Sequence, residues 1–141
     1  MANNFITKDD LSQDIYSEIL TGLTRANDDK ITTACAEALA EINGYVCARY
    51  DSTDLFGKTS NERNLTILAI ARTIAIYKLY KVCNKMNDLV RVEYEDTVSL
   101  LGKIQSGKFI LEGAKLLGQT ESLTPTSEAK SFSQTKRKNY L

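Results

Sequence analysis

The feature that most constrains the fold of this chain is the long apolar run from Leu65 to Val82. Large apolar side chains recur on nearly every face that a helix over this run would have, and Arg72 is the only charged residue in its first two thirds. A helix that is apolar on all sides is packed by neighbours on several sides. The preceding residues, Thr59 to Glu62, match a T-x-x-E capping box and predict where this helix begins. The run therefore predicts a central helix surrounded by others.

An N-terminal segment, about residues 8–21, predicts a first helix beside the central one. Thr7 and Asp10 form a capping-box-like pair at its start, and Gly22 suits its end. Its apolar residues recur at every fourth position, which places them on one helical face. They are Leu11, Ile15, Ile19 and Leu23.

Two longer segments, about residues 29–50 and 88–106, predict amphipathic helices. Asn27 and Asp28 are N-cap candidates for the first of them, while Asn87 and Gly107 suit the two ends of the second. The buried face of the first is predicted to consist of Ile31, Cys35, Ala38, Leu39, Ile42 and Val46. That of the second is predicted to consist of Val90, Tyr94, Val98, Leu101 and Ile104.

These segments together predict an all-α fold, a small bundle of about four helices around the central apolar helix. A single Pro and only seven Gly in 141 residues disfavour a turn-rich all-β fold. We expect a helical domain over residues 1–112 and an extended C-terminal tail over residues 113–141. The short apolar run 109–111 either packs back on the core or forms an edge strand.

The C-terminal tail has a composition unlike that of the rest of the chain. It is rich in Ser and Thr from Gln119 onward and shows no periodicity, which is typical of a segment that does not fold alone. Residues 128–141 hold four cations and one acid, a net charge of +3, while the whole chain is neutral. We expect a docking arm that folds on binding, although a solubilising extension is the alternative. Its candidate contact residues are Phe132, Lys136, Arg137, Lys138, Tyr140 and Leu141.

Several kinds of chemistry are excluded or disfavoured by the sequence. The chain has no histidine, which excludes Ser-His-Asp and Cys-His catalysis and His-ligated zinc. Glu93 and Glu95 are two residues apart and so point to different faces of a helix. No phosphate-binding glycine loop is present, and the Asn27–Asp29 cluster lacks the remaining ligands of an EF-hand. We therefore expect no enzymatic activity, no cofactor and no metal.

The cysteines and the apolar runs bear on the compartment. Cys35, Cys47 and Cys83 are odd in number and lie among apolar residues, so we expect buried free thiols in a reducing compartment. The longest uncharged apolar stretch is far shorter than a membrane span, and the N-terminus lacks the pattern of a signal peptide. These observations favour a protein that stays in, or is assembled in, a cytoplasm and has no membrane partner.

Three local features each leave two interpretations open. Leu55 and Phe56 either anchor their polar loop, residues 51–60, on their own domain or dock on a partner. Arg72 either extends to the surface or forms an ion pair with another subunit. A set of lysines at helical spacing forms either a solvated face or, with the tail, a DNA-binding surface. These lysines are Lys78, Lys81 and Lys85.

Short motifs in a fixed order resemble a family of Mu-like phage virion proteins. The start, Phe5-Ile-Thr-Lys-Asp-Asp-Leu11, resembles the family's "I-T-x-x-D-L", and an acidic turn follows at Asn27–Asp29. Residues 38–50 resemble "A-x-A-E-I-D-G-Y-L-x-x-R-Y", with Asn43 in place of the usual Asp. Residues 70–80 and 93–108 resemble the family's two later helices. The resemblance covers about residues 5–112, and the loop at 51–60 lacks the Pro-rich character common in the family.

The family looks like the head–tail connector, or adaptor, proteins of tailed phages. The resemblance implies a structural protein of the virion, at the head–tail junction, that is made in the host cytoplasm. It implies a ring of about twelve-fold symmetry beneath the portal, closed by a heterologous interface between neighbouring copies. The implied partners are the portal, the neighbouring copies and the next tail or head-completion protein. DNA would pass through the channel without sequence-specific binding.

Overall fold

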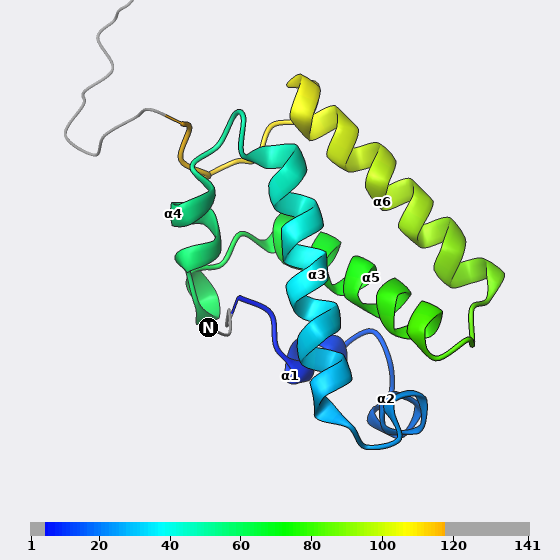
Figure 1. The fold of residues 1–141 in the computed structure, drawn as a ribbon. Helices are drawn as coiled ribbons and strands as arrows, with labels where there is room; N and C mark the ends of the chain where they lie inside the picture. Colours follow the sequence, from blue (N-terminus) through cyan, green and yellow to red (C-terminus); the bar gives the residue numbers. More distant parts are fainter. Residues whose placement is uncertain (1–4, 118–141) are drawn as a thin grey trace, which may run out of the picture.

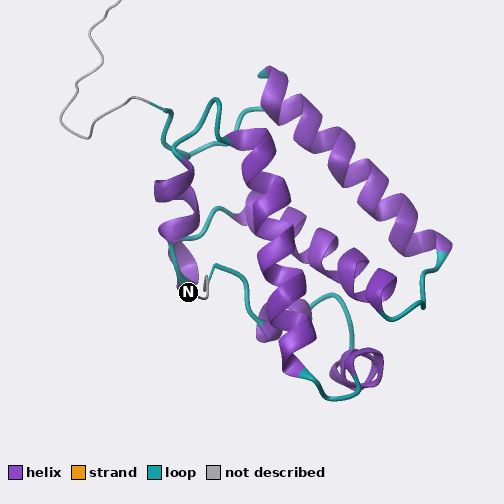
Figure 2. Cartoon of the chain, viewed as in Figure 1, coloured by secondary structure: helices purple, strands orange, loops and turns teal. Residues whose placement is uncertain are grey.

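The computed structural model describes residues 5–117 and shows an all-α fold, as predicted (Figures 1 and 2). Three long helices dominate it, and three shorter helices and one 3-10 turn complete the described part. In chain order the elements are α1 (Lys8–Leu11), α2 (Ser17–Thr24), α3 (Asp28–Val46), α4 (Ser52–Gly57), the 3-10 turn η1 (Ser60–Glu62), α5 (Leu65–Val82) and α6 (Asp88–Ser106). The predicted small bundle is therefore confirmed, although it consists of three long helices and several short ones.

The apolar helix α5 lies at the centre of the bundle, as its sequence predicts. It packs against α3 and α6 over much of its length and also contacts α1 and α2. Its buried residues are Ile67, Leu68, Ile70, Ala71, Ile74, Ala75 and Leu79. The predicted capping box at Thr59–Glu62 is wrong, because residues 60–62 form a 3-10 turn instead. Asn64 caps the helix, and its side-chain oxygen accepts a hydrogen bond of 3.1 Å from the Ile67 amide.

Helix α3 begins as predicted and ends earlier than predicted. The Asn27 side chain accepts a 3.0 Å hydrogen bond from the Asp29 amide and so caps the helix. All six residues of the predicted stripe are buried, and Ala34 joins them. The helix ends at Val46 rather than Tyr50, but the Tyr50 side chain turns back into the core and is fully buried.

The N-terminal segment forms two short helices where the sequence predicts one. The capping box of Thr7 and Asp10 is present and starts α1, but the chain leaves the helix after Leu11 and starts α2 at Ser17. The predicted stripe is therefore confirmed only in part, because Leu11 and Ile15 are buried and Leu23 packs against the core, but Ile19 does not. Leu20 is buried in α2, whereas Ile19 is 46% exposed.

Helix α6 matches its predicted limits and caps. The Asn87 side chain accepts a 2.9 Å hydrogen bond from the Val90 amide, and Gly107 takes a left-handed conformation after the last turn. Only Leu111 of the following apolar run is buried, and its amide donates a 3.0 Å hydrogen bond to the Tyr50 hydroxyl. The run thus packs back on the core through Leu111 alone, since Phe109 and Ile110 are exposed, and the single β-bridge found in residues 5–117 pairs Tyr50 with Leu116.

Candidate interaction surfaces

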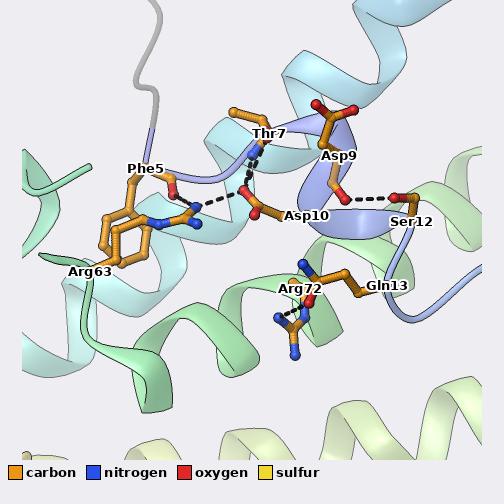
Figure 3. Close-up of polar contacts among 8 residues, drawn as sticks. All are labelled: Phe5, Thr7, Asp9, Asp10, Ser12, Gln13, Arg63 and Arg72. Atoms are coloured by element: carbon orange, nitrogen blue, oxygen red, sulfur yellow. Dashed lines mark hydrogen bonds and ion pairs between the residues drawn. The ribbon is translucent and has the colours of Figure 1, made fainter. Parts of the chain in front are cut away.

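A polar latch fastens the N-terminal segment to the bundle (Figure 3). Arg63, which precedes α5, donates hydrogen bonds of 2.8 Å to Oδ2 of Asp10 and 2.9 Å to the carbonyl oxygen of Phe5. Oδ2 of Asp10 also accepts from the amide and the hydroxyl of Thr7. Burial alone raises the pKa of Asp10, but the hydrogen bonds from Arg63 and Thr7 outweigh it and leave this pKa below its ordinary value. The latch holds Phe5 and α1 in one position.

Arg72, a candidate for contact with another subunit, is engaged within its own chain. Its Nε atom lies 3.0 Å from Oδ2 of Asp14, and its Nη1 atom donates a 3.2 Å hydrogen bond to the side chain of Gln13. These partners belong to the linker between α1 and α2, which Arg72 therefore ties to the central helix. An ion pair with a neighbouring subunit would have to compete with this internal pair.

Leu55 and Phe56 lie on α4, a helix that the sequence did not predict. The Asp51 side chain accepts a 3.2 Å hydrogen bond from the Asp54 amide and caps this helix. Leu55 is buried in the core, so it anchors the segment on its own domain. Phe56 is half-buried and packs edge-to-face on Phe5, with ring centroids 5.4 Å apart.

A groove beside α4 contains Phe56 among its lining residues. It has a volume of about 830 Å³ and lies between α3, α4 and the N-terminal segment. Its two charged residues, Lys8 and Asp28, neutralise one another across 3.2 Å. This groove is therefore mostly uncharged, and it offers Phe56 as an aromatic contact.

The predicted lysine face does not form as one surface. Nζ of Lys78 lies 3.0 Å from Glu41 of α3, and both side chains are about one-fifth exposed. Lys81 is exposed at the end of α5, while Lys85 lies beyond the helix, which ends at Val82. The common helical face of Lys78, Lys81 and Lys85 is therefore a wrong prediction.

Glu41 belongs to a polar cluster that sequence reasoning missed. The Tyr94 hydroxyl of α6 donates a 2.8 Å hydrogen bond to Oε2 of Glu41, and the Tyr94 ring stacks on Tyr77 with centroids 3.8 Å apart. Burial, the hydrogen bond to Glu41 and its negative charge raise the pKa of Tyr94 above its ordinary value. The cluster joins α3, α5 and α6 at one point, and the only sign of it in the sequence is that Tyr94 lies on an apolar stripe.

The three cysteines differ in their surroundings, so the expectation that all are buried is wrong. Cys35 is buried in α3, and burial together with the negative charge of Asp10 raises its pKa to about 11. Cys83 is half-buried, and its thiol donates to the Leu23 carbonyl oxygen across 2.7 Å. Cys47 is exposed because α3 ends before it.

A second groove, between α5 and the first half of α6, is acidic. It has a volume of about 600 Å³, and Ile76, Tyr80 and Leu89 are among its apolar lining residues. Its charged residues are Asp14, Arg72, Glu93 and Asp96. Arg72 is paired with Asp14, while Glu93 and Asp96 are exposed and have no ion pair within residues 5–117. We call this feature the acidic groove.

The tail residues predicted to contact a partner lie outside the described residues. They are Phe132, Lys136, Arg137, Lys138, Tyr140 and Leu141. The described chain ends beside the C-terminal end of α3, where the Leu117 amide donates a 3.0 Å hydrogen bond to the Arg49 carbonyl oxygen. The tail therefore continues from that end of the bundle.

The comparison that decides the family covers most of the chain. Residues 5–132 match the family model described as Bacteriophage Mu, Gp36. The chain belongs to the bacteriophage Mu Gp36 family. The predicted likeness to a Mu-like phage protein is thereby confirmed, and no curated protein matches the chain.

The Gp36 match reaches further than the motifs that suggest it. Those motifs end at about residue 112, whereas the match continues to residue 132 and includes Phe132. The last nine residues, which contain Lys136, Arg137, Lys138, Tyr140 and Leu141, lie beyond it. Within residues 5–117, this Gp36-family protein has no helix long and apolar enough to cross a bilayer, and no three of its His, Cys, Asp or Glu side chains gather as metal ligands would.

Proposed function

We propose that this Gp36-family chain is a structural protein of the virion, a head–tail connector that forms a ring beneath the portal. The observation that carries the proposal is the family match over residues 5–132, which makes the chain a protein of a Mu-type phage. The connector role itself comes from the likeness of its motifs to phage adaptor proteins. The proposed protein has no catalytic activity and no cofactor.

The construction of the body supports a mechanical role. The central helix α5 is buried by α3 and α6, and polar ties at Asp10–Arg63, Asp14–Arg72 and Glu41–Lys78 hold the surrounding elements to it. Each of these three ties joins two segments that are far apart in sequence, so it resists their separation. A component that transmits load between capsid and tail needs such a body.

A ring places demands on the surface of each copy. In a closed ring every copy presents two different patches, one to each neighbour, because the interface is heterologous. The proposed partners are two neighbouring copies, the portal and the next tail or head-completion protein. DNA passes through the channel, with no sequence-specific contact.

DNA binding is the competing function, and the described residues provide little support for it. The lysine face on which it depends is not formed, since Lys78 is paired with Glu41 and Lys85 lies beyond the helix. A phosphate-binding protein loses affinity steeply with salt, with a slope near −0.9 per phosphate contact. A salt titration that gave such a slope with duplex DNA would favour this function over the connector.

The copy number in purified virions tests the proposal. Quantitative mass spectrometry with isotope-labelled reference peptides would measure this protein and the portal protein in the same particles. We expect equal copy numbers, because a ring beneath the portal matches its symmetry. Absence from virions, or a copy number like that of the capsid shell or tail tube, would refute a portal-matched ring.

A variant of the tail tests the docking arm. We expect a chain with Phe132→Ser, Tyr140→Ser and Leu141→Ser to lose assembly of infectious particles, because the apolar anchors are removed while the charge is retained. A matched control carries Thr120→Ser, Thr124→Ser and Thr126→Ser and should assemble normally. Normal particle yield from the anchor variant would refute the docking arm and leave the ring to be judged by copy number.

A further inference from the structure

The acidic groove is an unoccupied surface with the chemistry of a peptide-binding site. Glu93 and Asp96 lie three residues apart on α6, so they project on the same side of that helix. Both are exposed and unpaired within residues 5–117. The apolar side chain of Leu89, one helical turn before Glu93, is 67% exposed. A ligand with apolar and cationic groups side by side would satisfy both features.

The chain itself contains a segment of that chemistry. Residues 130–141 combine four cations with the apolar side chains of Phe132, Tyr140 and Leu141, and they contain no acid. The acidic groove suits such a segment better than the larger groove beside α4 does, because that groove holds one cation and one anion that neutralise each other. The charge of the segment and that of the acidic groove are opposite, as at electrostatically matched interfaces.

The positions of the tail and the groove favour binding between copies. The described chain ends beside the C-terminal end of α3, while the acidic groove lies against the first half of α6, at the other end of the bundle (Figure 1). When the tail leaves one end of a copy and the acidic groove lies at the other end, binding of the tail to a neighbour's groove is a head-to-tail contact. This is the heterologous type of interface that a ring requires. The 12 residues between Leu117 and the basic segment, residues 118–129, would span up to about 40 Å when extended, which is enough to reach a neighbouring molecule of this size.

We infer that the acidic groove of each copy binds the basic C-terminal segment, residues 130–141, of the neighbouring copy. This inference rests on the proposed ring and names the contact that links its members. The carboxylates of Glu93 and Asp96 pair with Lys136, Arg137 and Lys138, and an apolar side chain of the segment covers Leu89. The Asp14–Arg72 pair remains internal and forms one wall of the groove.

Zero-length crosslinking of the full chain tests the contact directly. Equal amounts of ¹⁴N- and ¹⁵N-labelled protein are mixed at high concentration and low salt, and a carbodiimide joins lysine amines to carboxylates in contact. We expect crosslinks from Lys136 or Lys138 to Glu93 or Asp96, with mixed-isotope and same-isotope pairs in equal amounts. Pairs of a single isotope would show that the tail occupies its own groove, and tail crosslinks only to other sites, or none, would also overturn the inference.

Charge reversal provides a second test that does not depend on a reagent. The groove variant (Glu93→Lys, Asp96→Lys) and the tail variant (Lys136→Glu, Arg137→Glu, Lys138→Glu) should each associate at least tenfold more weakly than the wild type in sedimentation velocity. A mixture of the two should regain association, because each tail then meets a groove of opposite charge. A control with two exposed acids outside the groove changed (Glu18→Lys, Glu37→Lys) should associate like the wild type, and a mixture that stays dissociated would overturn the inference.

The two proposals fail in different ways. If virions contain the protein in portal-matched copy number but crosslinked virions lack the tail–groove pairs, the groove assignment is wrong and the ring remains. If the pairs form in solution while virions lack the protein, the contact is real and the connector function is wrong. Far-ultraviolet circular dichroism of each variant establishes that a loss of association is not a loss of fold.

Discussion

Arg63 and Asp10 form an ion pair in which Nη1 lies 2.8 Å from Oδ2, and both side chains are largely buried. The same guanidinium nitrogen donates to the Phe5 carbonyl oxygen. The ion pair therefore holds the start of the described chain against Arg63, which lies just before α5. Since Phe5 is itself buried and packs on Phe56, the latch also closes one side of the core.

Removing the charge of Asp10 should destabilise the fold. Asp10→Asn removes the anion that lies 2.8 Å from the largely buried Arg63 guanidinium, and we expect a loss of about 2–3 kcal/mol in the free energy of unfolding at pH 7. Urea denaturation followed by circular dichroism measures it. Asp9→Asn is the control, because Asp9 is exposed and lies on the same short helix, and it should change stability by less than about 0.5 kcal/mol.

The pH dependence of that loss follows from the lowered pKa of Asp10. Because the folded-state pKa lies below the ordinary value of 3.8, the contribution is complete above pH 3.8 and is lost as the pH falls through the folded pKa. The difference between wild type and Asp10→Asn should therefore be constant from pH 5 to pH 7 and shrink below about pH 4. A difference that persisted undiminished at pH 2 would contradict this assignment.

Only the local half of this latch was predictable from the sequence. Thr7 and Asp10 match a capping pattern because both partners lie within one turn of the same helix. Arg63 lies 53 residues away, and its approach depends on how the N-terminal segment folds over the bundle. The same contrast separates α6, whose caps are local and were predicted, from the break between α1 and α2, where the linker residues Gln13 and Asp14 bind the distant Arg72.

The candidate contact residues Arg72 and Leu55 could not be assigned from the sequence for a similar physical reason. The sequence leaves Arg72 and Leu55 with two interpretations each, because helical periodicity gives the face of a residue but not the partner opposite it. The structure pairs Arg72 with Asp14 and buries Leu55. The acidic groove was not predictable in this way, since it needs α5 and α6 side by side with the α1–α2 linker across their ends.

The Glu41–Lys78–Tyr94 cluster should act as one cooperative unit. We expect Tyr94→Phe to cost about 1 kcal/mol, because it removes the 2.8 Å hydrogen bond to Glu41 while retaining the ring that stacks on Tyr77. Lys78→Met should lower the free energy of unfolding more in the wild type than in a Glu41→Gln background. In that background Lys78 has no anion at position 41 to neutralise, so its removal loses less. Urea denaturation of the four combinations measures the coupling, and strictly additive changes would contradict it.

The raised pKa of Tyr94 predicts an alkaline effect on stability. The unfolded chain ionises this tyrosine near its ordinary pKa of 10.0, whereas the folded protein keeps it protonated to higher pH. The contribution of Tyr94 is therefore complete below pH 10.0 and is lost as the pH rises above it. Tyr94→Phe should lose less stability than the wild type between pH 9 and pH 11, and equal losses would contradict the prediction.

The three thiols should react in the order of their exposure. Cys47 is exposed and should react first with Ellman's reagent, while Cys35, buried and with a pKa of about 11, should react at least about 100-fold more slowly at pH 8. Cys83, half-buried with its thiol engaged by the Leu23 carbonyl oxygen, should be intermediate. Peptide mapping at timed intervals measures the order, and Cys47→Ser should remove the fast phase alone.

Two glycines near the end of α6 should respond to alanine in opposite directions. Gly107 has a φ of +86°, which L side chains rarely adopt, and an added Cβ would lie 2.8 Å from Nη2 of Arg49. We expect Gly107→Ala to destabilise the protein by about 1–2 kcal/mol, mostly through the backbone, because the flexible end of the Arg49 side chain can move away.

Gly102 is the matched control for this position. It lies in the same helix, at an ordinary helical φ, and nothing lies within 4 Å of the position that its Cβ would take. Gly102→Ala should therefore stabilise the protein by about 0.5–1 kcal/mol, since alanine loses less backbone entropy in a helix. Thermal and urea denaturation of both variants would measure the two changes. If Gly107→Ala were as stable as Gly102→Ala, the left-handed conformation after α6 would not be required for the fold. The chain could then take a different backbone conformation at residue 107 and still bring the Leu111 amide to the Tyr50 hydroxyl.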